Sequence, residues 1–431
     1  MGATGPEFTK VVDEAKKAFE ADDADRVRAI VERHPDLKAL INEPIGPFDS
    51  PAITNVRSRE MLDVLLDAGA DINARTRWWA GGFGLLDCAD PELAAYAIER
   101  GAAVDPHAAA RLGMMDRLRE LIAQDPGSVH ARGGDGQTPL HFVSRVDIAE
   151  YLLDHGAEID ARDVDHESTP AQYMVGDRQD VARYLVSRGC KTDILMGVAL
   201  GDLDLVRRHL DADPDGIRMR VSDECFPMVD KKAGGTIYQW TLGFHVSVHG
   251  VARKFGHQDI LQVLLDHSPA DVRLIDACWR GDEAAVHAIR AEQPDIIGRL
   301  SEADHRQVAH AARNNEISVV RLMLECGWPP DARGQHQATP LHWAAFHGNP
   351  DMARDVLRFD PPLELTDADF SGTPLRWAIY GSENGWYAKT GDYGATVDAL
   401  IRAGATLPGA IEGSDAVRDA LRRHGLSERS S

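Results

Sequence analysis

Apolar positions recur at helical spacing along most of the chain. In residues 147–157 (DIAEYLLDHGA) and 395–405 (ATVDALIRAGA), apolar side chains return every three or four positions. One stripe of each predicted helix is therefore apolar and packs on its neighbours. A glycine, Gly156 or Gly404, stands near the end of each stretch, where a helix commonly terminates with a positive φ. The pattern predicts many short amphipathic helices.

Two short motifs repeat along the chain and show how these helices are arranged. TPLH occurs at 138–141 and at 339–342, and TPAQ at 169, TPLR at 373 and SPAI at 50 are variants of it. A second marker follows the motif, as in DAGADINAR from 67, DHGAEIDAR from 154 and RAGATLP from 402. Threonine or serine before proline supplies an N-cap hydroxyl and a preorganised first helical residue, while the leucine turns inward. The repeating unit is thus predicted to be helix, turn, helix and loop.

These motifs resemble those of the ankyrin-repeat family. The steps from 138 to 169 and from 339 to 373 are close to its period of roughly 33 residues. The resemblance covers residues 8–424, and it implies an all-α solenoid of about twelve helix-turn-helix repeats with finger loops and a concave binding groove. It further implies N-terminal repeats over 8–216, an inserted hairpin or loop over 217–246, and C-terminal repeats with a cap over 247–424, forming one continuous solenoid.

Three insertions interrupt the repeat period, and each carries tryptophan. They span 75–84, 217–244 and 382–393, and they contain Trp78, Trp79, Trp240 and Trp386. In the second insertion, TIYQWTLGF is β-branched and aromatic and DKKAGG supplies a turn, so we expect a β-hairpin. Loops of this length are functional or fold back to bury their own aromatic side chains, and the sequence leaves both interpretations open.

Composition and charge narrow the class of partner. The 431 residues include 47 Lys and Arg against 69 Asp and Glu, which gives a formal charge of −22. A phosphate backbone would be repelled by this acidic protein, so nucleic acid is not an expected partner. No apolar run reaches membrane-spanning length, and we expect no membrane partner. The five cysteines are scattered and never form CxxC, which is typical of reduced thiols in a cytoplasmic protein.

The stretch FHVSVHGVARKFGHQD, residues 244–259, raises the question of a metal site. His245 and His249 have the i, i+4 spacing of two zinc ligands on one helix. Alignment with TPLHWAAFHGN places Ser247 on Thr339, so the helix begins near Ser247 and His245 precedes it. His249 then occupies a core leucine position, where it must be buried with a partner or face a pocket. We expect no metal and no cofactor here.

The finger DVDHEST, residues 163–169, departs from the repeat consensus. Glu167 occupies the position where the preceding finger has the turn glycine Gly136, so the same turn has a conformational cost. Asp163, Asp165, His166 and Glu167 could supply a carboxylate pair or ligands for a hard cation. We favour a solvated acidic tip, since runs of charged residues are usually hydrated.

The resemblance also implies where ligand contacts lie. Family members bind at finger tips and at the end of the first helix of a repeat. The corresponding candidates, together with two insertion tryptophans, are Asp165, His166, Glu167, Trp240, Trp279, Arg280, Arg313, Asn314, His336, Phe346, His347, Asp369, Tyr380 and Trp386. A separate row recurs one position after the TPLH histidine and is interpreted as core that stacks between repeats: Phe142, Tyr173, His310, Trp343 and Trp377.

Two functions fit this sequence. The first is a non-catalytic recognition scaffold that binds a protein or peptide in its concave groove. The alternative is an enzyme or binding protein for a small polar ligand such as a carbohydrate, with a pocket formed by the groove and the tryptophan-bearing insertions. If the chain is an enzyme, carboxylates and histidine would act as acid and base, as in a hydrolase or lyase. The sequence has no glycine-rich phosphate loop, nucleophile elbow or HExxH motif, and identifies no catalytic residue.

Overall fold

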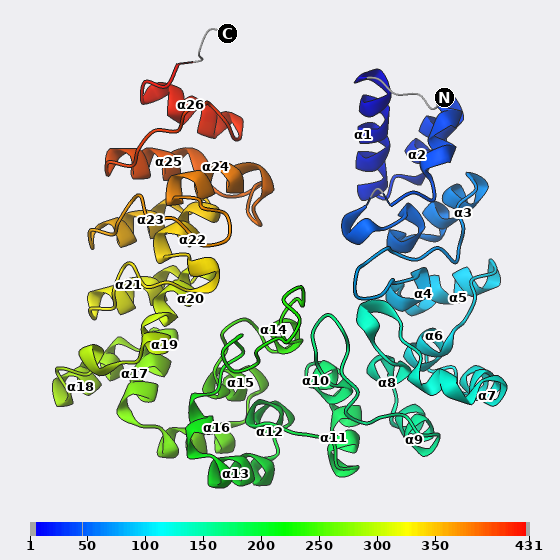
Figure 1. The fold of residues 1–431 in the computed structure, drawn as a ribbon, viewed down its shortest axis with the longest axis horizontal. Coiled ribbons are helices and arrows are strands. Elements are labelled where there is room, and N and C mark those ends of the chain that lie inside the picture. The colour runs from blue at the N-terminus through cyan, green and yellow to red at the C-terminus, as the bar shows by residue number, and fades with distance from the viewer. Residues whose placement is uncertain (1–5, 45, 428–431) are drawn as a thin grey trace. The chain divides into compact units, whose positions relative to one another are not determined.

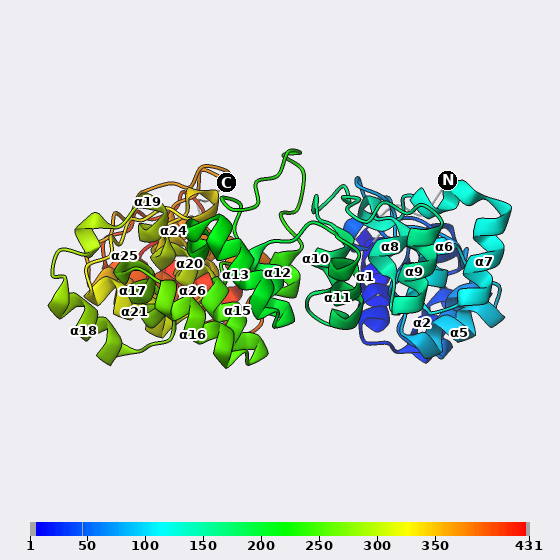
Figure 2. The same ribbon diagram turned by 90° about the horizontal axis from the view of Figure 1, so that it is seen from below.

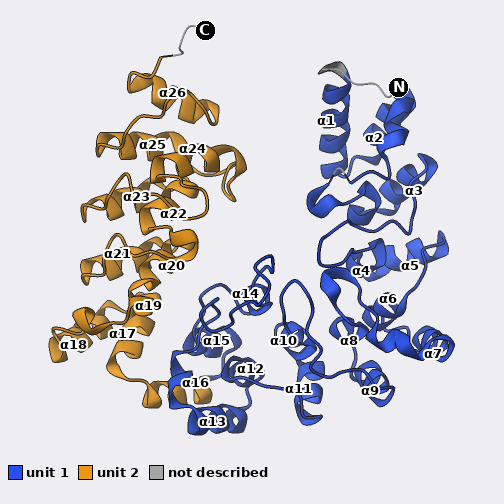
Figure 3. Cartoon of the chain, viewed as in Figure 1, with its two compact units in different colours: residues 1–257 blue, residues 258–431 orange. Residues whose placement is uncertain are grey.

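The computed structural model describes residues 6–44 and 46–427. The chain divides into two compact units, residues 1–257 and 258–431 (Figure 3). Throughout the described ranges the regular elements are helices, and β-type pairing is limited to isolated bridges such as that between Arg220 and Ser247. The predicted all-α class is confirmed. The domain boundaries drawn from the repeat pattern remain a prediction.

The first unit contains the helices α1 to α15 (Figure 1). Their bounds are α1 Pro6–Glu20, α2 Ala24–Arg33, α3 Arg59–Asp67, α4 Leu85–Cys88, α5 Pro91–Glu99, α6 Pro106–Arg111, α7 Met115–Gln124, α8 Pro139–Phe142, α9 Val146–Asp154, α10 Pro170–Met174, α11 Gln179–Ser187, α12 Ile194–Leu200, α13 Leu203–Ala212, α14 Tyr238–Thr241 and α15 Val248–Phe255. The pairs α8/α9 and α10/α11 lie side by side in both views (Figure 1, Figure 2).

The second unit continues with helices of similar length. Their bounds are α16 Gln258–His267, α17 Ala270–Trp279, α18 Glu283–Glu292, α19 Glu302–His305, α20 Gln307–Arg313, α21 Ile317–Glu325, α22 Pro340–Phe346, α23 Pro350–Leu357, α24 Pro374–Asn384, α25 Tyr393–Arg402 and α26 Asp415–Arg423. Here α20, α22 and α24 pack in one row and α21, α23 and α25 pack in a second row. The apolar core lies between the rows and includes the buried Leu341 and Trp328.

The TPLH motif explains why each repeat begins where it does. Thr339 is the N-cap of α22, and its backbone N–H and its hydroxyl both contact Nδ1 of His342, at 3.2 and 2.8 Å. Because Nδ1 accepts the N–H of Thr339, the proton is on Nε2, which donates to the carbonyl of Gly372 in the next finger at 3.1 Å. The motif therefore caps its own helix and fastens the following finger. Its inward-facing leucine and its capping threonine are both as predicted.

The expected β-hairpin in the second insertion is wrong. Residues 238–241 form the short helix α14, with Tyr238 fully buried and its hydroxyl donating to Oδ2 of Asp193 at 2.9 Å. Ile237 and Leu242 are also buried beside it. Because the β preference of such residues depends strongly on context, burial of these three side chains against the repeats determines the conformation.

Among the described residues no helix combines the length and the apolar character needed to cross a bilayer. The five cysteines are free thiols, and Cys190, Cys278 and Cys326 are buried.

Candidate functional site

The third insertion encloses an aromatic pocket in the second unit. It begins in the last turn of α24 and ends at Tyr393, the first residue of α25, which donates its hydroxyl to the carbonyl of Phe346 at 2.8 Å. The resulting cavity has a volume of about 550 Å³. We name this cavity the aromatic pocket. The residues that line it include His336, Trp343, Phe346, Phe370, Arg376, Trp377, Ile379, Tyr380, Trp386 and Glu412.

Ring contacts hold the insertion tryptophan in place. The indole of Trp386 stacks on Trp343 with centroids 6.0 Å apart, and it meets Phe346 edge-on at 5.4 Å. The guanidinium carbon of Arg313 lies 5.2 Å from the Trp386 centroid and 5.7 Å from the Trp343 centroid. A cation over two indole faces is favourable, most of all when it is poorly hydrated, and Arg313 is buried. Trp386 is therefore positioned by its contacts although much of its surface faces solvent.

Three large aromatic side chains of this pocket remain exposed. Phe370, Tyr380 and Trp386 have 70%, 61% and 60% of their surface accessible. Charged groups lie beside them. Nη1 of Arg376 is 2.7 Å from Oε2 of Glu412, and Nδ1 of His336 is 2.5 Å from Oδ2 of Asp369. The pocket thus combines an apolar lining with a rim that can hydrogen-bond.

The second unit brings together six of the residues predicted from sequence. His336, Phe346, Tyr380 and Trp386 line the pocket, while Arg313 and Asp369 contact its lining. The repeat pattern did not identify Arg376 and Glu412 as lining, whereas it did place Phe370 at a finger position. It indicated a core position for Trp343 and Trp377, and both are buried, yet their rings also form the pocket wall.

Other predicted residues of this unit lie outside the pocket lining. The exposed helix position predicted for His347 is wrong, because this residue is buried with Nε2 2.9 Å from the carbonyl of Arg313. Burial lowers the pKa of its imidazole to about 4. Trp279 is half-buried against the core and donates to Oε1 of Gln307 at 3.3 Å. Arg280 forms ion pairs with Asp276 of α17 and with Asp282, the N-cap of α18, and Asn314 is the C-cap of α20.

In the first unit, the finger 163–169 lies beneath the second insertion. The carboxylate of Glu167 accepts the backbone N–H groups of Val229 and Asp230 at 2.9 and 2.7 Å. Gly234 donates its N–H to the carbonyl of Asp165 at 2.8 Å. The predicted solvated acidic tip is wrong, because Asp163, Asp165 and His166 are all buried. The backbone of the insertion replaces water as the hydrogen-bonding partner of the finger.

Asp163 stabilises the conformation of this finger through carboxylate hydrogen bonds within the finger and to Tyr173. Its carboxylate accepts the N–H groups of His166 and Ser168 at 2.8 and 2.7 Å and the hydroxyl of Tyr173 at 3.0 Å. Glu167 has a φ of 44°, and Gly136 of the preceding finger has a φ of 70°. The prediction that Glu167 occupies a position suited to glycine is confirmed.

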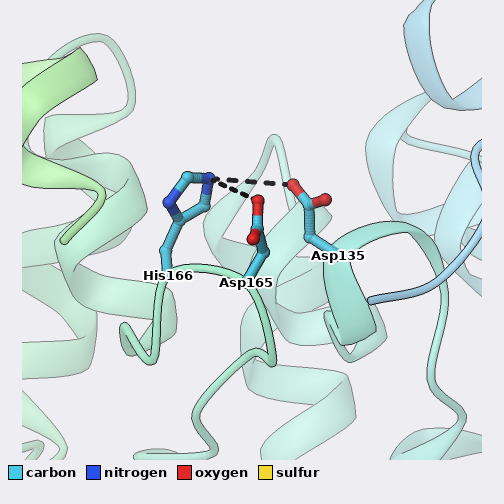
Figure 4. A group of neighbouring side chains, drawn as sticks. All are labelled: Asp135, Asp165 and His166. Atoms are coloured by element: carbon cyan, nitrogen blue, oxygen red, sulfur yellow. Dashed lines mark ion pairs between the residues drawn. The ribbon is translucent and has the colours of Figure 1, made fainter. Parts of the chain in front are cut away.

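The first insertion reaches the same region. Asp135 donates its N–H to the carbonyl of Gly81 at 3.2 Å, and the indole of Trp78 hydrogen-bonds to its carboxylate. Burial and the neighbouring Asp165 carboxylate raise the pKa of Asp135 to about 6. Donor atoms of Asp135, Asp165 and His166 lie within 4.8 Å of one another (Figure 4), and we name these three residues the finger cluster. The sequence signal for Asp135 was its place in GGDG, one finger before DVDHEST.

The remaining candidates of the first unit are not members of the finger cluster. Trp240 is 66% exposed, with the ring of Phe244 as its aromatic neighbour at 5.6 Å. Ser247 caps α15 by accepting the N–H of Gly250 at 3.2 Å, so His245 precedes the helix as predicted. His249 is buried, and Nε2 of His257 is 3.3 Å from the carbonyl of Ala199.

Comparison with known proteins identifies the repeat. Residues 107–195 match a family model described as ankyrin repeats (3 copies), and residues 308–357 match one described as ankyrin repeats (many copies). The E3 ubiquitin-protein ligase XB3 of Oryza sativa subsp. japonica is 37% identical over 93 residues, 21% of each chain. The palmitoyltransferase Hip14 of Drosophila melanogaster is 27% identical over 124 residues, 29% of this chain and 18% of that protein. The serine/threonine-protein kinase VIK of Arabidopsis thaliana is 38% identical over 76 residues, 17% of each. The chain therefore spans only a small part of the length of each relative.

Proposed function

We propose that this chain, which is an ankyrin-repeat protein, is a recognition module that binds a protein partner through the aromatic pocket of its second unit. The observation that supports this proposal most strongly is that Phe370, Tyr380 and Trp386 line one cavity and are each more than half exposed. Exposed aromatic groups that converge in this way mark interaction sites in proteins.

The relatives support binding more than catalysis. Their names state three different activities, a ubiquitin ligase, a palmitoyltransferase and a protein kinase. Each covers less than a third of this chain, and ankyrin repeats generally mediate contacts between proteins. The property that these proteins share with this chain is therefore the repeat array.

The shape and chemistry of the pocket define the partner segment. An apolar or aromatic side chain would enter between Trp386 and Trp377, because a buried aromatic anchor in an apolar pocket gives much of the affinity of such interfaces. Backbone or polar groups on either side of the anchor would meet the Arg376–Glu412 pair at the rim. The expected partner is an extended or helical segment with one large apolar anchor.

Selection from a random peptide library tests this proposal for a partner defined only by its chemistry. The library is displayed on phage and selected against the full chain, and the dissociation constants of enriched peptides are measured by fluorescence anisotropy. Peptides with an aromatic or large aliphatic anchor are expected to be enriched. Trp386→Ala should weaken their binding by at least about tenfold, the effect of losing one interface hot spot.

Trp240→Ala is the matched control, since Trp240 has the same side chain and similar exposure but lies in the first unit. Its affinity for the selected peptides should equal that of the wild type. Unchanged peptide binding in Trp386→Ala would contradict the proposal. A thermal shift with free sugars that is lost in Trp386→Ala, without any peptide enrichment, would favour the small-ligand alternative and overturn it.

A further inference from the structure

The finger cluster of the first unit has the arrangement of a metal site. Nε2 of His166 is 3.8 Å from Oδ2 of Asp135 and 3.8 Å from Oδ2 of Asp165 (Figure 4). His166 and Asp165 are buried, and the Asp135 side chain is 14% exposed. The three donor atoms converge from the tips of two consecutive fingers. Both distances exceed that of a hydrogen bond, so direct hydrogen bonding between these side chains does not explain the arrangement.

The hydrogen bond on the other ring nitrogen determines what His166 offers. Nδ1 lies 2.7 Å from the carbonyl oxygen of Gly235, and a carbonyl can only accept, so Nδ1 carries the proton. In the neutral ring the lone pair of Nε2 therefore points at the two carboxylates, and Nε2 has no hydrogen-bond partner among the described residues. Histidines that ligate metals show the same feature, since a carbonyl on one nitrogen fixes the tautomer and orients the other nitrogen.

We propose that Asp135, Asp165 and His166 bind one divalent cation of the first transition series, such as Zn²⁺ or Mn²⁺. A cation at the centre would neutralise two carboxylates that otherwise face one another and a lone pair. Ca²⁺ and Mg²⁺ prefer sites made of oxygen alone, whereas an imidazole nitrogen suits zinc or iron, and the two carboxylates also suit manganese. Three protein ligands leave positions for water or for a group of a partner.

The surrounding chain holds each of the three ligands in place through backbone hydrogen bonds. The carbonyl of Asp135 accepts the N–H groups of Val164 and Asp165 at 2.8 and 3.2 Å, which ties the two fingers together. Gly234 donates its N–H to Oδ1 of Asp165 at 3.2 Å, which leaves Oδ2 for the cluster. The first insertion holds Asp135 through Gly81, and the second holds His166 through Gly235. The cation would therefore link two consecutive fingers, and each of these fingers is held by one of the insertions.

Calorimetric titration of the full chain tests the metal site. The protein is treated with chelator, dialysed, and titrated with ZnCl₂ and separately with MnCl₂. We expect one ion per chain for at least one of these metals, a higher melting temperature when it is bound, and weaker binding of Ca²⁺. Asp135→Asn and His166→Gln should each weaken binding by at least about tenfold, because each removes a ligand.

Asp177→Asn is the matched control. Asp177 is an exposed carboxylate of the same unit, so this variant removes the same charge without touching the finger cluster, and it should bind as the wild type does. The absorption spectrum of the Co²⁺-loaded wild type provides a second readout that does not depend on the folding of a variant. It should show d–d bands of a mixed nitrogen and oxygen site. Absence of stoichiometric binding, or equal affinity in wild type, Asp135→Asn and His166→Gln, would overturn the proposal.

Discussion

Glu167 fastens the second insertion to the finger beneath it, and the Glu167→Gly variant separates this role from the conformation of the finger. The wild-type carboxylate accepts two N–H groups of the insertion while its backbone has a φ of 44°. Glycine takes this conformation without the steric cost of a Cβ atom but cannot accept the two hydrogen bonds. The substitution therefore removes the backbone strain at position 167 and also removes the two hydrogen bonds that hold the second insertion.

The lost hydrogen bonds and the relieved backbone strain change the free energy of unfolding by similar amounts and in opposite directions. Hydrogen bonds to a charged group contribute about 1.5–3 kcal/mol each when buried, and the part-exposed Glu167 carboxylate reduces this to about 1–2 kcal/mol for the pair. Relief of the positive φ is worth about 1–2 kcal/mol, less about 0.5–1 kcal/mol for the greater chain freedom of glycine when unfolded. Global stability should change by no more than about 2 kcal/mol. Local opening of the insertion should increase about 5–30-fold, the equilibrium factor for 1–2 kcal/mol.

Limited trypsin digestion measures the local effect, because Lys231 and Lys232 are exposed and directly follow the anchored Asp230. Cleavage tracks the population of the open form when opening and closing are fast. Ser371→Gly is the matched control. Ser371 has a φ of 52° and occupies the corresponding position of DADFSGT in the second unit, where no such anchor is present in the described contacts. It should be slightly stabilised and show wild-type cleavage at both lysines.

An equal cleavage rate at Lys231 and Lys232 in wild type and Glu167→Gly would refute this account of the insertion. A large loss of global stability would also contradict it, since the strain at Glu167 would then be absent. Chemical denaturation of the same samples measures that quantity.

Two further predictions concern the repeat scaffold. Leu341→Ala should lower the free energy of unfolding by about 2–5 kcal/mol in chemical denaturation, because Leu341 is a fully buried core side chain, and a loss below about 1 kcal/mol would place it outside the core. Burial lowers the pKa of His342 to about 4, below the value of about 6.5 in the unfolded chain. Between these values the unfolded state takes up a proton that the folded state does not, so this contribution is complete above pH 6.5 and decreases as the pH falls toward 4. Between about pH 4 and 6.5, His342→Gln should therefore reduce the slope of the free energy of unfolding against pH by up to about 1.4 kcal/mol per pH unit. Equal slopes for wild type and His342→Gln would contradict the lowered pKa of His342.

The repeat arrangement was predictable because its signals are local. A threonine before proline caps a helix within one turn, and the leucine of TPLH faces inward whatever the neighbouring sequence is, as Thr339 and Leu341 show. The strained position of Glu167 followed from a comparison of two adjacent fingers and needed no long-range contact. Five of the six predicted residues at the pocket came from repeat register in the same way, and the sixth, Trp386, came from the tryptophan-bearing insertion.

The errors concern contacts between segments that are distant in the sequence. Tyr238 has a high β preference but forms a helix, because its hydroxyl reaches Asp193, which is 45 residues away. The acidic finger is buried by an insertion more than 60 residues downstream, as the bond from Asp230 to Glu167 shows. The repeat register predicts an exposed His347, but its imidazole reaches the carbonyl of Arg313 in the preceding repeat. Helical periodicity reports only on neighbouring positions, so it does not predict these contacts between distant segments.

The most direct test of the aromatic pocket as the partner site is hydrogen–deuterium exchange of the full chain with and without a selected anchor peptide. Peptide binding is expected to slow exchange in residues 367–372 and 382–393, which carry Phe370 and Trp386 at the pocket. Exchange throughout residues 6–257 should be unchanged. Slowed exchange confined to the first unit, or equal exchange in 382–393 with saturating peptide, would contradict it.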